Sequence, residues 1–267
     1  MESRTPSSTV TLSEGFDLRD TQTGISHHVY TLGQGPPVIL MHEITGMTVP
    51  FLALADRIAG HGFRVYLPHF FGPIDQRDLP AGILFCLRNE FNVWCSGGES
   101  RITNWLRSLC ERADEESGRC GVGVIGLCLT GNIVLSAMVL DCVRVGVMCE
   151  PALPFAHKSA LGVPQGDIEK ARDRAQIFPM MAYRFSTDTK YPHARFQTLA
   201  DTFGAGIHLT EIPTGVAPWY IPNRKHSVLT DDQIPQVNDP NHPVQHAVDE
   251  ILAMLRRRLR TPINAYL

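Results

Sequence analysis

Short apolar runs alternate along the chain with longer segments in which apolar residues recur at helical spacing. Runs of the first kind are typical of buried parallel strands, and segments of the second kind are typical of amphipathic helices. The predicted strands cover residues 38–43, 63–67, 121–125, 143–148, 177–185 and 207–212. The predicted helices cover residues 49–59, 99–116, 132–140, 167–176, 193–203 and 244–260.

Strands that alternate with helices predict an α/β fold, with a mostly parallel central sheet and helices on both faces. Residues 10–32 add two short alternating segments, which predict a hairpin. Residues 72–98 and 150–166 interrupt the alternation, and we expect each to be a lid or an insertion. Residues 1–8 are expected to form a flexible tail. Because no internal repeat or long linker divides the chain, we expect a single domain over residues 1–267.

The segment GLCLTG, residues 126–131, lies at the junction between a predicted strand and a predicted helix. A nucleophile flanked by small residues at such a junction is the pattern of a nucleophile elbow, a strained turn that exposes the nucleophile at the end of the strand. The central residue is Cys128, so the nucleophile would be a thiol. The positive end of the following helix would favour its thiolate. The alternative role of a single cysteine is that of a small buried hydrophobe.

Two further reactive residues follow late strands of the predicted sheet, where ligands of parallel sheets bind. Asp188 comes just after the strand at residues 177–185, and His226 follows the strand at residues 207–212. The order nucleophile, acid, histidine is that of the catalytic triads of α/β-hydrolases. We therefore predict that His226 is the general base and that Asp188 orients it. Three other histidines stay open as alternatives for the base: His208, His242 and His246.

Glu43 ends the first predicted parallel strand and would face the same crevice as Cys128. A buried carboxylate beside a thiol makes the thiolate harder to form, because two like charges would share one site of low dielectric. We therefore expect Glu43 to guard the resting nucleophile. The backbone N–H groups of Ile44 and Leu129 are the predicted oxyanion donors.

These residues resemble dienelactone hydrolase and its relatives within the α/β-hydrolase superfamily. The resemblance covers the chain from residue 37 to the C-terminal helix. It implies the α/β-hydrolase fold, a Cys-His-Asp triad and hydrolysis of a cyclic enol lactone through an acyl-thioester. It also implies that the glutamate matching Glu43 contacts the cysteine in the resting enzyme until substrate displaces it. The resemblance rests on residues 38–43 with Ile44 and Gly46, on Tyr66-Leu67-Pro68 with Phe71, on Gly126-Leu127-Cys128-Leu129, on Asp188 and on His226-Ser227.

The chain departs from the family pattern at the elbow and at the substrate carboxylate. Thr130 stands where the family elbow has a glycine, and we expect it to crowd the turn. The family holds the substrate carboxylate with two arginines, one of them soon after the catalytic histidine, where this chain has residues 228–230, Val-Leu-Thr. The other arginine corresponds to Arg77 or Arg88, and Arg88 enters as the candidate substrate-binding residue. The hydrolase chemistry is thus better supported than the dienelactone substrate.

Composition narrows the class of protein. Hydrophobic residues make up 43% and charged residues 19%, which is typical of a globular chain. The net charge of −3 gives no electrostatic case for nucleic acid, and no apolar run is long enough to span a membrane. The polar N-terminus lacks a signal-peptide core, and none of the seven cysteines forms a Cys-x-x-Cys pair, which favours a reduced, cytoplasmic protein.

The leading functional hypothesis is a hydrolase of small esters or lactones that uses no cofactor or metal. Its expected partner is a small-molecule substrate, with no nucleic acid and no membrane, and we expect a monomer or a small homo-oligomer. Two alternatives stay open. The first is a non-catalytic ligand-binding or regulatory protein of the same fold. The second is an acyl-thioester hydrolase or acyltransferase that uses the same triad.

Overall fold

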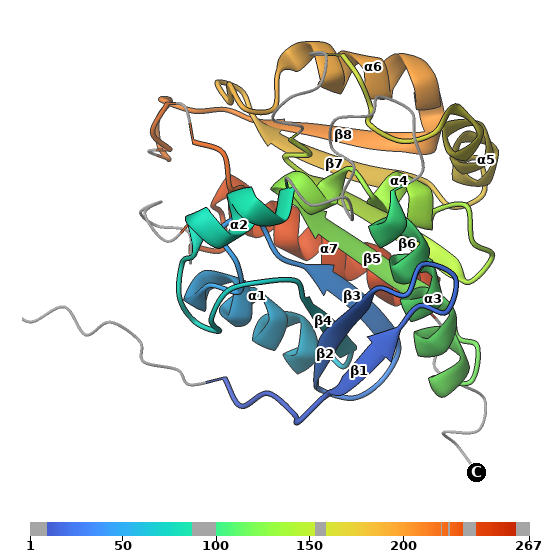
Figure 1. Ribbon diagram of the computed structural model, residues 1–267. Helices are drawn as coiled ribbons and strands as arrows, with labels where there is room; N and C mark the ends of the chain where they lie inside the picture. Colours follow the sequence, from blue (N-terminus) through green and yellow to red (C-terminus); the bar gives the residue numbers. More distant parts are fainter. Residues whose placement is uncertain are drawn as a thin grey trace, which may run out of the picture.

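An eight-stranded sheet forms the centre of the computed structural model, in the order β1-β2-β4-β3-β5-β6-β7-β8 (Figure 1). β2 pairs antiparallel with β1 and β4, and every other neighbouring pair is parallel. The structure describes residues 10–86, 100–152, 159–219, 221–223, 225–231 and 239–259. The strands are β1 (Phe16–Arg19), β2 (Ser26–Leu32), β3 (Pro37–Met41), β4 (Arg64–His69), β5 (Val122–Leu127), β6 (Val143–Cys149), β7 (Met180–Phe185) and β8 (Ile207–Ile212).

Helices cover both faces of this sheet (Figure 1). Helices α1 (Val49–Gly60) and α7 (Pro243–Arg258) pack on one face. Helices α3 (Arg101–Glu116), α5 (Gln165–Ala175) and α6 (His193–Phe203) pack on the other. The sequence predicts these five helices to within two residues at each end. Within the part of the chain that the structure describes, no helix is long and apolar enough to cross a membrane.

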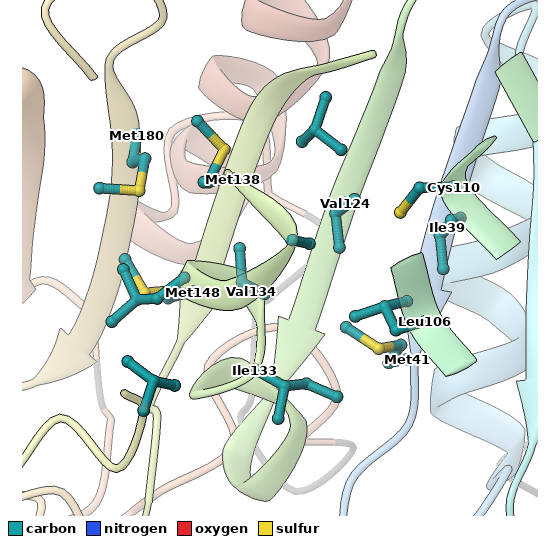
Figure 2. Close-up of a cluster of buried hydrophobic side chains, with 14 of the residues drawn as sticks. Ile39, Met41, Leu106, Cys110, Val124, Ile133, Val134, Met138, Met148 and Met180 are labelled. Atoms are coloured by element: carbon teal, nitrogen blue, oxygen red, sulfur yellow. The ribbon is translucent and has the colours of Figure 1, made fainter. Parts of the chain in front are cut away.

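Each face of the sheet has its own apolar cluster, which explains why the central strands are continuous apolar runs. Along β3, Ile39 belongs to the cluster under α3 and Leu40 to the cluster under α1 and α7. β5 repeats this alternation with Val124 and Ile125. Figure 2 shows the first cluster, in which Ile39 and Val124 lie among side chains such as Leu106 of α3. The predicted α/β architecture is therefore confirmed.

The helix predicted over residues 132–140 is wrong in extent. After β5 the chain forms a 3₁₀ turn, η1 (Cys128–Gly131), and then only the four-residue helix α4 (Val134–Ala137). Side chains bind carbonyls that a longer helix would use: Asn132 Nδ2 donates to Leu129 O at 3.2 Å, and Arg107 Nε donates to Ser136 O at 3.1 Å. Because so short a helix has a small dipole, the electrostatic support expected for the thiolate from this source is small.

The first predicted lid, residues 72–98, contains the helix α2 (Leu79–Cys86) in its described part. α2 lies directly over the residues that follow β3. A Cβ atom at Gly82 would be 1.9 Å from the carbonyl O of Ile44, so only glycine permits this approach. Within the second predicted insertion, residues 153–158 lie outside the described residues, as do residues 87–98 of the first.

Candidate active site

Cys128 occupies the tight turn between β5 and η1. Its φ of +53° lies in the left-handed region, which residues other than glycine rarely adopt. A Cβ atom at Gly126 would be 2.4 Å from the carbonyl O of Thr130, so the turn closes too tightly for a side chain there. The local backbone is thus the strained strand-to-helix turn of a nucleophile elbow.

Thr130 supports this turn through its hydroxyl. Thr130 Oγ1 accepts the N–H of Leu127 at 2.9 Å and lies 3.2 Å from the carbonyl O of Met41, at the end of β3. The side chain that we expected to crowd the elbow therefore ties it to the neighbouring strand.

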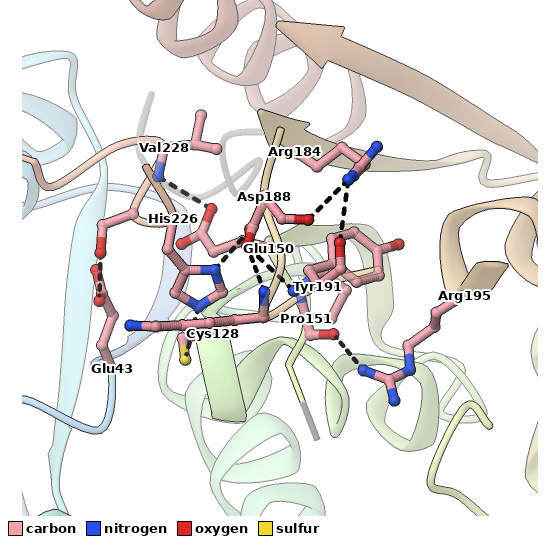
Figure 3. Close-up of polar contacts among 12 residues, drawn as sticks. Glu43, Cys128, Glu150, Pro151, Arg184, Asp188, Tyr191, Arg195, His226 and Val228 are labelled. Atoms are coloured by element: carbon pink, nitrogen blue, oxygen red, sulfur yellow. Dashed lines mark hydrogen bonds and ion pairs between the residues drawn. The ribbon is translucent and has the colours of Figure 1, made fainter. Parts of the chain in front are cut away.

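The predicted nucleophile, base and acid come from three different loops and meet at one point (Figure 3). His226 Nε2 is 3.1 Å from Cys128 Sγ, and His226 Nδ1 is 2.6 Å from Asp188 Oδ2. The other carboxylate oxygen of Asp188 accepts the backbone N–H groups of Lys190 at 2.8 Å and Tyr191 at 3.1 Å. The acid is thus held in place, binds the Nδ1–H of the histidine and leaves Nε2 facing the thiol.

The alternative histidines lie elsewhere. His208 is on the edge strand β8 and lines a different cavity, together with Glu250 of α7. His242 precedes α7, where its Nδ1 accepts the N–H of Val244 at 3.1 Å, and His246 lies within that helix. Of the four histidines considered, the structure brings His226 to Cys128.

The electrostatics of His226 favour its protonated form. Burial disfavours a charged imidazolium, but the charge of Cys128 and the hydrogen bond with Asp188 outweigh it and raise the pKa of His226 well above its ordinary value. A protonated histidine that faces a cysteine stabilises the thiolate. A protonated His226 can therefore give a thiolate the electrostatic support that the short helix after the elbow does not.

A cavity of about 920 Å³ opens above Cys128, a size suited to a small-molecule ligand. Ile44 and Leu129, the predicted oxyanion donors, both line it. Leu79 and Ile83 of α2 add apolar surface on the side of Ile44. Residues 186–190, the loop after β7, contribute polar surface.

Glu43 binds the loop that carries His226. Its carboxylate accepts hydrogen bonds from the hydroxyls of Ser227, at 2.7 Å, and Thr230. The thiol of Cys128 instead faces His226. The structure therefore differs from the contact between Glu43 and the cysteine that the resemblance implies, and has the thiol engaged with the histidine.

Glu150 is a site residue that the sequence analysis missed. It directly follows β6, is fully buried, and its Oε2 accepts the N–H of Val228 at 3.1 Å. The signal was available, because Glu150 is a charged residue at the carboxyl end of a predicted strand, as Glu43 is. Because many prolines, alanines and glycines follow it, the sequence analysis placed Glu150 in the predicted insertion at residues 150–166.

The basic residues considered for a substrate carboxylate are only partly described. Arg88 lies outside the described residues. Arg77 lines a second cavity, of about 200 Å³, together with His226. Lys225 forms an ion pair with Asp231 at 3.0 Å.

Solved structures of several hydrolases share this architecture. A Klebsiella pneumoniae protein assigned as a dienelactone hydrolase is 17% identical, covers 71% of this chain and 81% of its own, and has a TM-score of 0.52. A cold-adapted esterase from an Arctic intertidal metagenomic library is 15% identical over 92% of this chain and 93% of its own, with a TM-score of 0.57. The thioesterase domain of the curacin biosynthetic pathway is 10% identical over 91% and 99%, with a TM-score of 0.54.

The chain has the α/β-hydrolase fold. The sheet order, the elbow after β5 and the loops after β7 and β8 are those of this fold. No protein-family model and no curated protein matches the chain. Since the identities to the solved structures are low, the likeness shows the fold alone. The substrate has to be inferred from the chemistry of the site.

The hydroxyl of Thr130 is expected to contribute to stability. Thr130→Val would leave the buried N–H of Leu127 without its partner, at a cost of about 1–3 kcal/mol in the free energy of unfolding. Thr130→Ser keeps the hydroxyl and should stay close to the wild type. Urea denaturation of the three proteins measures the difference, and a Val variant as stable as the Ser variant would contradict this role.

The protonation of His226 is expected to depend on both of its neighbours. Its pKa is raised, so the ring should stay protonated to a higher pH than an ordinary histidine. Cys128→Ala and Asp188→Asn each remove an interaction that favours the imidazolium, so both should move the titration of His226 to lower pH. NMR titration of histidine-labelled protein reads this directly. A wild-type His226 that titrates like a free histidine would show that no thiolate–imidazolium pair forms.

Proposed function

We propose that this protein hydrolyses small carboxylic esters or lactones through an acyl-thioester on Cys128. The observation that carries the proposal is the continuous chain of contacts from Asp188 to His226 to Cys128 at the base of a cavity. Buried groups of this kind, connected in this order and open to a ligand, are the parts that nucleophilic catalysis requires.

The geometry supports a two-step mechanism. The thiolate of Cys128 attacks the carbonyl carbon of the ester, and the N–H groups of Leu129 and Ile44 stabilise the oxyanion. As the intermediate collapses, His226 gives its proton to the departing alkoxide, which leaves an acyl-thioester and an alcohol. His226 then takes a proton from water, whose hydroxide attacks the thioester. The second collapse releases the carboxylic acid and restores the thiolate.

The cavity favours a substrate with an apolar part. Ile44, Leu79 and Ile83 line the cavity that contains the thiol, together with the polar residues of the loop after β7. A dienelactone-like substrate is the finer form of the proposal. It is supported by the cysteine elbow with the strand-end Glu43, and by the position of Arg77 next to the cavity that His226 lines.

Cys128→Ala is expected to abolish turnover while the fold is kept. Loss of the nucleophile of a triad costs up to about 10⁶-fold in kcat. The measurement is a panel of p-nitrophenyl esters, lactones and acyl-thioesters, run on the wild type and the variant. Cys142→Ala is the matched control, because Cys142 is a partly exposed free cysteine just before β6 and does not line the cavity.

The panel separates the three functional classes. Turnover of oxygen esters or lactones that depends on Cys128 supports the proposal. Turnover confined to acyl-thioesters assigns the alternative chemistry on the same triad. A wild type that turns over none of the substrates, together with slow alkylation of Cys128 by iodoacetamide, would make the protein a binding module.

We further propose that Glu43 restrains the nucleophile. Glu43→Gln removes a negative charge that lies against the His226 loop, near the thiolate. Alkylation of Cys128 without substrate should therefore become faster, by up to about tenfold. Turnover should nevertheless fall, because an amide oxygen and an amide nitrogen cannot both accept the hydroxyls of Ser227 and Thr230. Alkylation and turnover that both match the wild type would reduce Glu43 to an ordinary strand-end residue.

A further inference from the structure

Glu150 occupies an unusual backbone position next to the nucleophile. Its φ is +39°, in the region that glutamate rarely adopts. The N–H of Glu150 donates to Tyr183 O of β7 at 2.8 Å, and two residues later the N–H of Ala152 donates to Cys128 O at 3.1 Å. These bonds fix Glu150 between the elbow and β7. Strain of this kind persists only where the surroundings enforce it, and it is frequent at functional sites.

The carboxyl group of Glu150 is incompletely paired. The side chain is fully buried, Oε2 accepts the N–H of Val228 at 3.1 Å, and Oε1 has no hydrogen-bond partner among the described residues. Figure 3 shows this group beside the ring of His226. An ionised carboxylate with a bare oxygen in the interior is very costly, whereas a neutral acid is far less so.

The charged groups around Glu150 also disfavour its ionisation. Burial is the largest effect, and the charges of Glu43 at the end of β3 and of Cys128 act in the same direction. His226 and the N–H of Val228 act in the opposite direction and are outweighed, so the pKa of Glu150 is raised well above its ordinary value. Glu150 also interacts electrostatically with Cys149 of β6 and with Tyr191 of the loop after β7, and disfavours the ionisation of both.

Glu150 and Glu43 bind consecutive parts of one loop. Glu43 accepts the hydroxyls of Ser227 and Thr230, and Glu150 accepts the backbone N–H of Val228 between them. β3 and β6, which these residues follow, lie on either side of β5 in the sheet. The two carboxyl groups therefore hold the loop that carries His226 from both sides of the elbow.

We propose that Glu150 is a positioning residue of the active site, a neutral carboxylic acid that anchors the His226 loop without adding a negative charge beside the thiolate. The proposal rests on the proposed function, because it assigns Glu150 a role in the reaction of Cys128. An uncharged anchor is the useful one here, since an extra carboxylate charge would disfavour the thiolate.

The first test compares two variants of Glu150. Glu150→Ala removes the acceptor of the Val228 N–H, so the loop is no longer fixed, and kcat should fall by about 10²-fold with KM little changed. The titration of His226 should also shift, and alkylation of Cys128 should slow. Glu150→Gln is neutral and keeps an acceptor oxygen, so it should rescue most of what Ala loses. A Gln variant as impaired as the Ala variant would contradict the claim that Glu150 is neutral. An Ala variant with the kcat and the His226 titration of the wild type would contradict the claim that Glu150 positions the loop.

The second test needs no substrate and reads the protonation of Glu150 from stability. A raised pKa in the folded state means that the stability contributed by the neutral acid is complete below the ordinary pKa of glutamate and is lost as pH rises. The Tm of Glu150→Gln should therefore gain on that of the wild type as pH increases from 5 to 8. Glu169→Gln, an exposed position on α5, is the control and should give a difference that does not change with pH.

The two tests separate the failure of this inference from the failure of the proposed function. If the wild type hydrolyses nothing while the Tm difference for Glu150→Gln widens with pH, Glu150 is neutral and the enzymatic role is wrong. If the wild type is an active hydrolase and that difference is flat, Glu150 is ionised and the inference is overturned.

Discussion

The turn that closes on Gly126 constrains the rest of the site. Because residue 128 takes a positive φ and no side chain fits at residue 126, the thiol has one position at the end of β5. The loops after β7 and β8 bring Asp188 and His226 to this position, where His226 lies within hydrogen-bonding distance of both the thiol and the Asp188 carboxylate. The strands on either side, β3 and β6, supply carboxyl groups that hold the histidine loop to this point.

Much of this could be predicted from the sequence, because parallel strands bring their carboxyl ends to one edge of a sheet. That rule is enough to predict from the sequence that Cys128, Asp188, His226 and Glu43 lie at the same edge of the sheet. It could not predict the partners of Glu43, since Ser227 lies 184 residues away and hydroxyl contacts leave no pattern in the sequence. The extent of the helix after the elbow is a separate error. Apolar spacing predicts a helix there but does not reveal that Asn132 and Arg107 bind its carbonyls.

Among the described residues, three carboxyl groups bind His226 or its loop, and they are hydrogen-bonded to different degrees. Asp188 accepts from the histidine and from two backbone N–H groups, Glu43 accepts from two hydroxyls, and Glu150 accepts from one N–H. Buried charge is tolerated in proportion to the donors that surround it. The donors therefore stabilise a negative charge best on Asp188, which binds His226, and least on Glu150.

Asp188 performs two tasks with one short side chain. One oxygen binds the histidine, and the other accepts the N–H two residues ahead, which closes the small ring of an Asx turn and gives the loop its shape. Side-chain length, and not only charge, is therefore fixed at this position. A glutamate would carry the same charge on one more methylene and could not close the same ring. Asp188 thus both binds His226 and shapes its own loop.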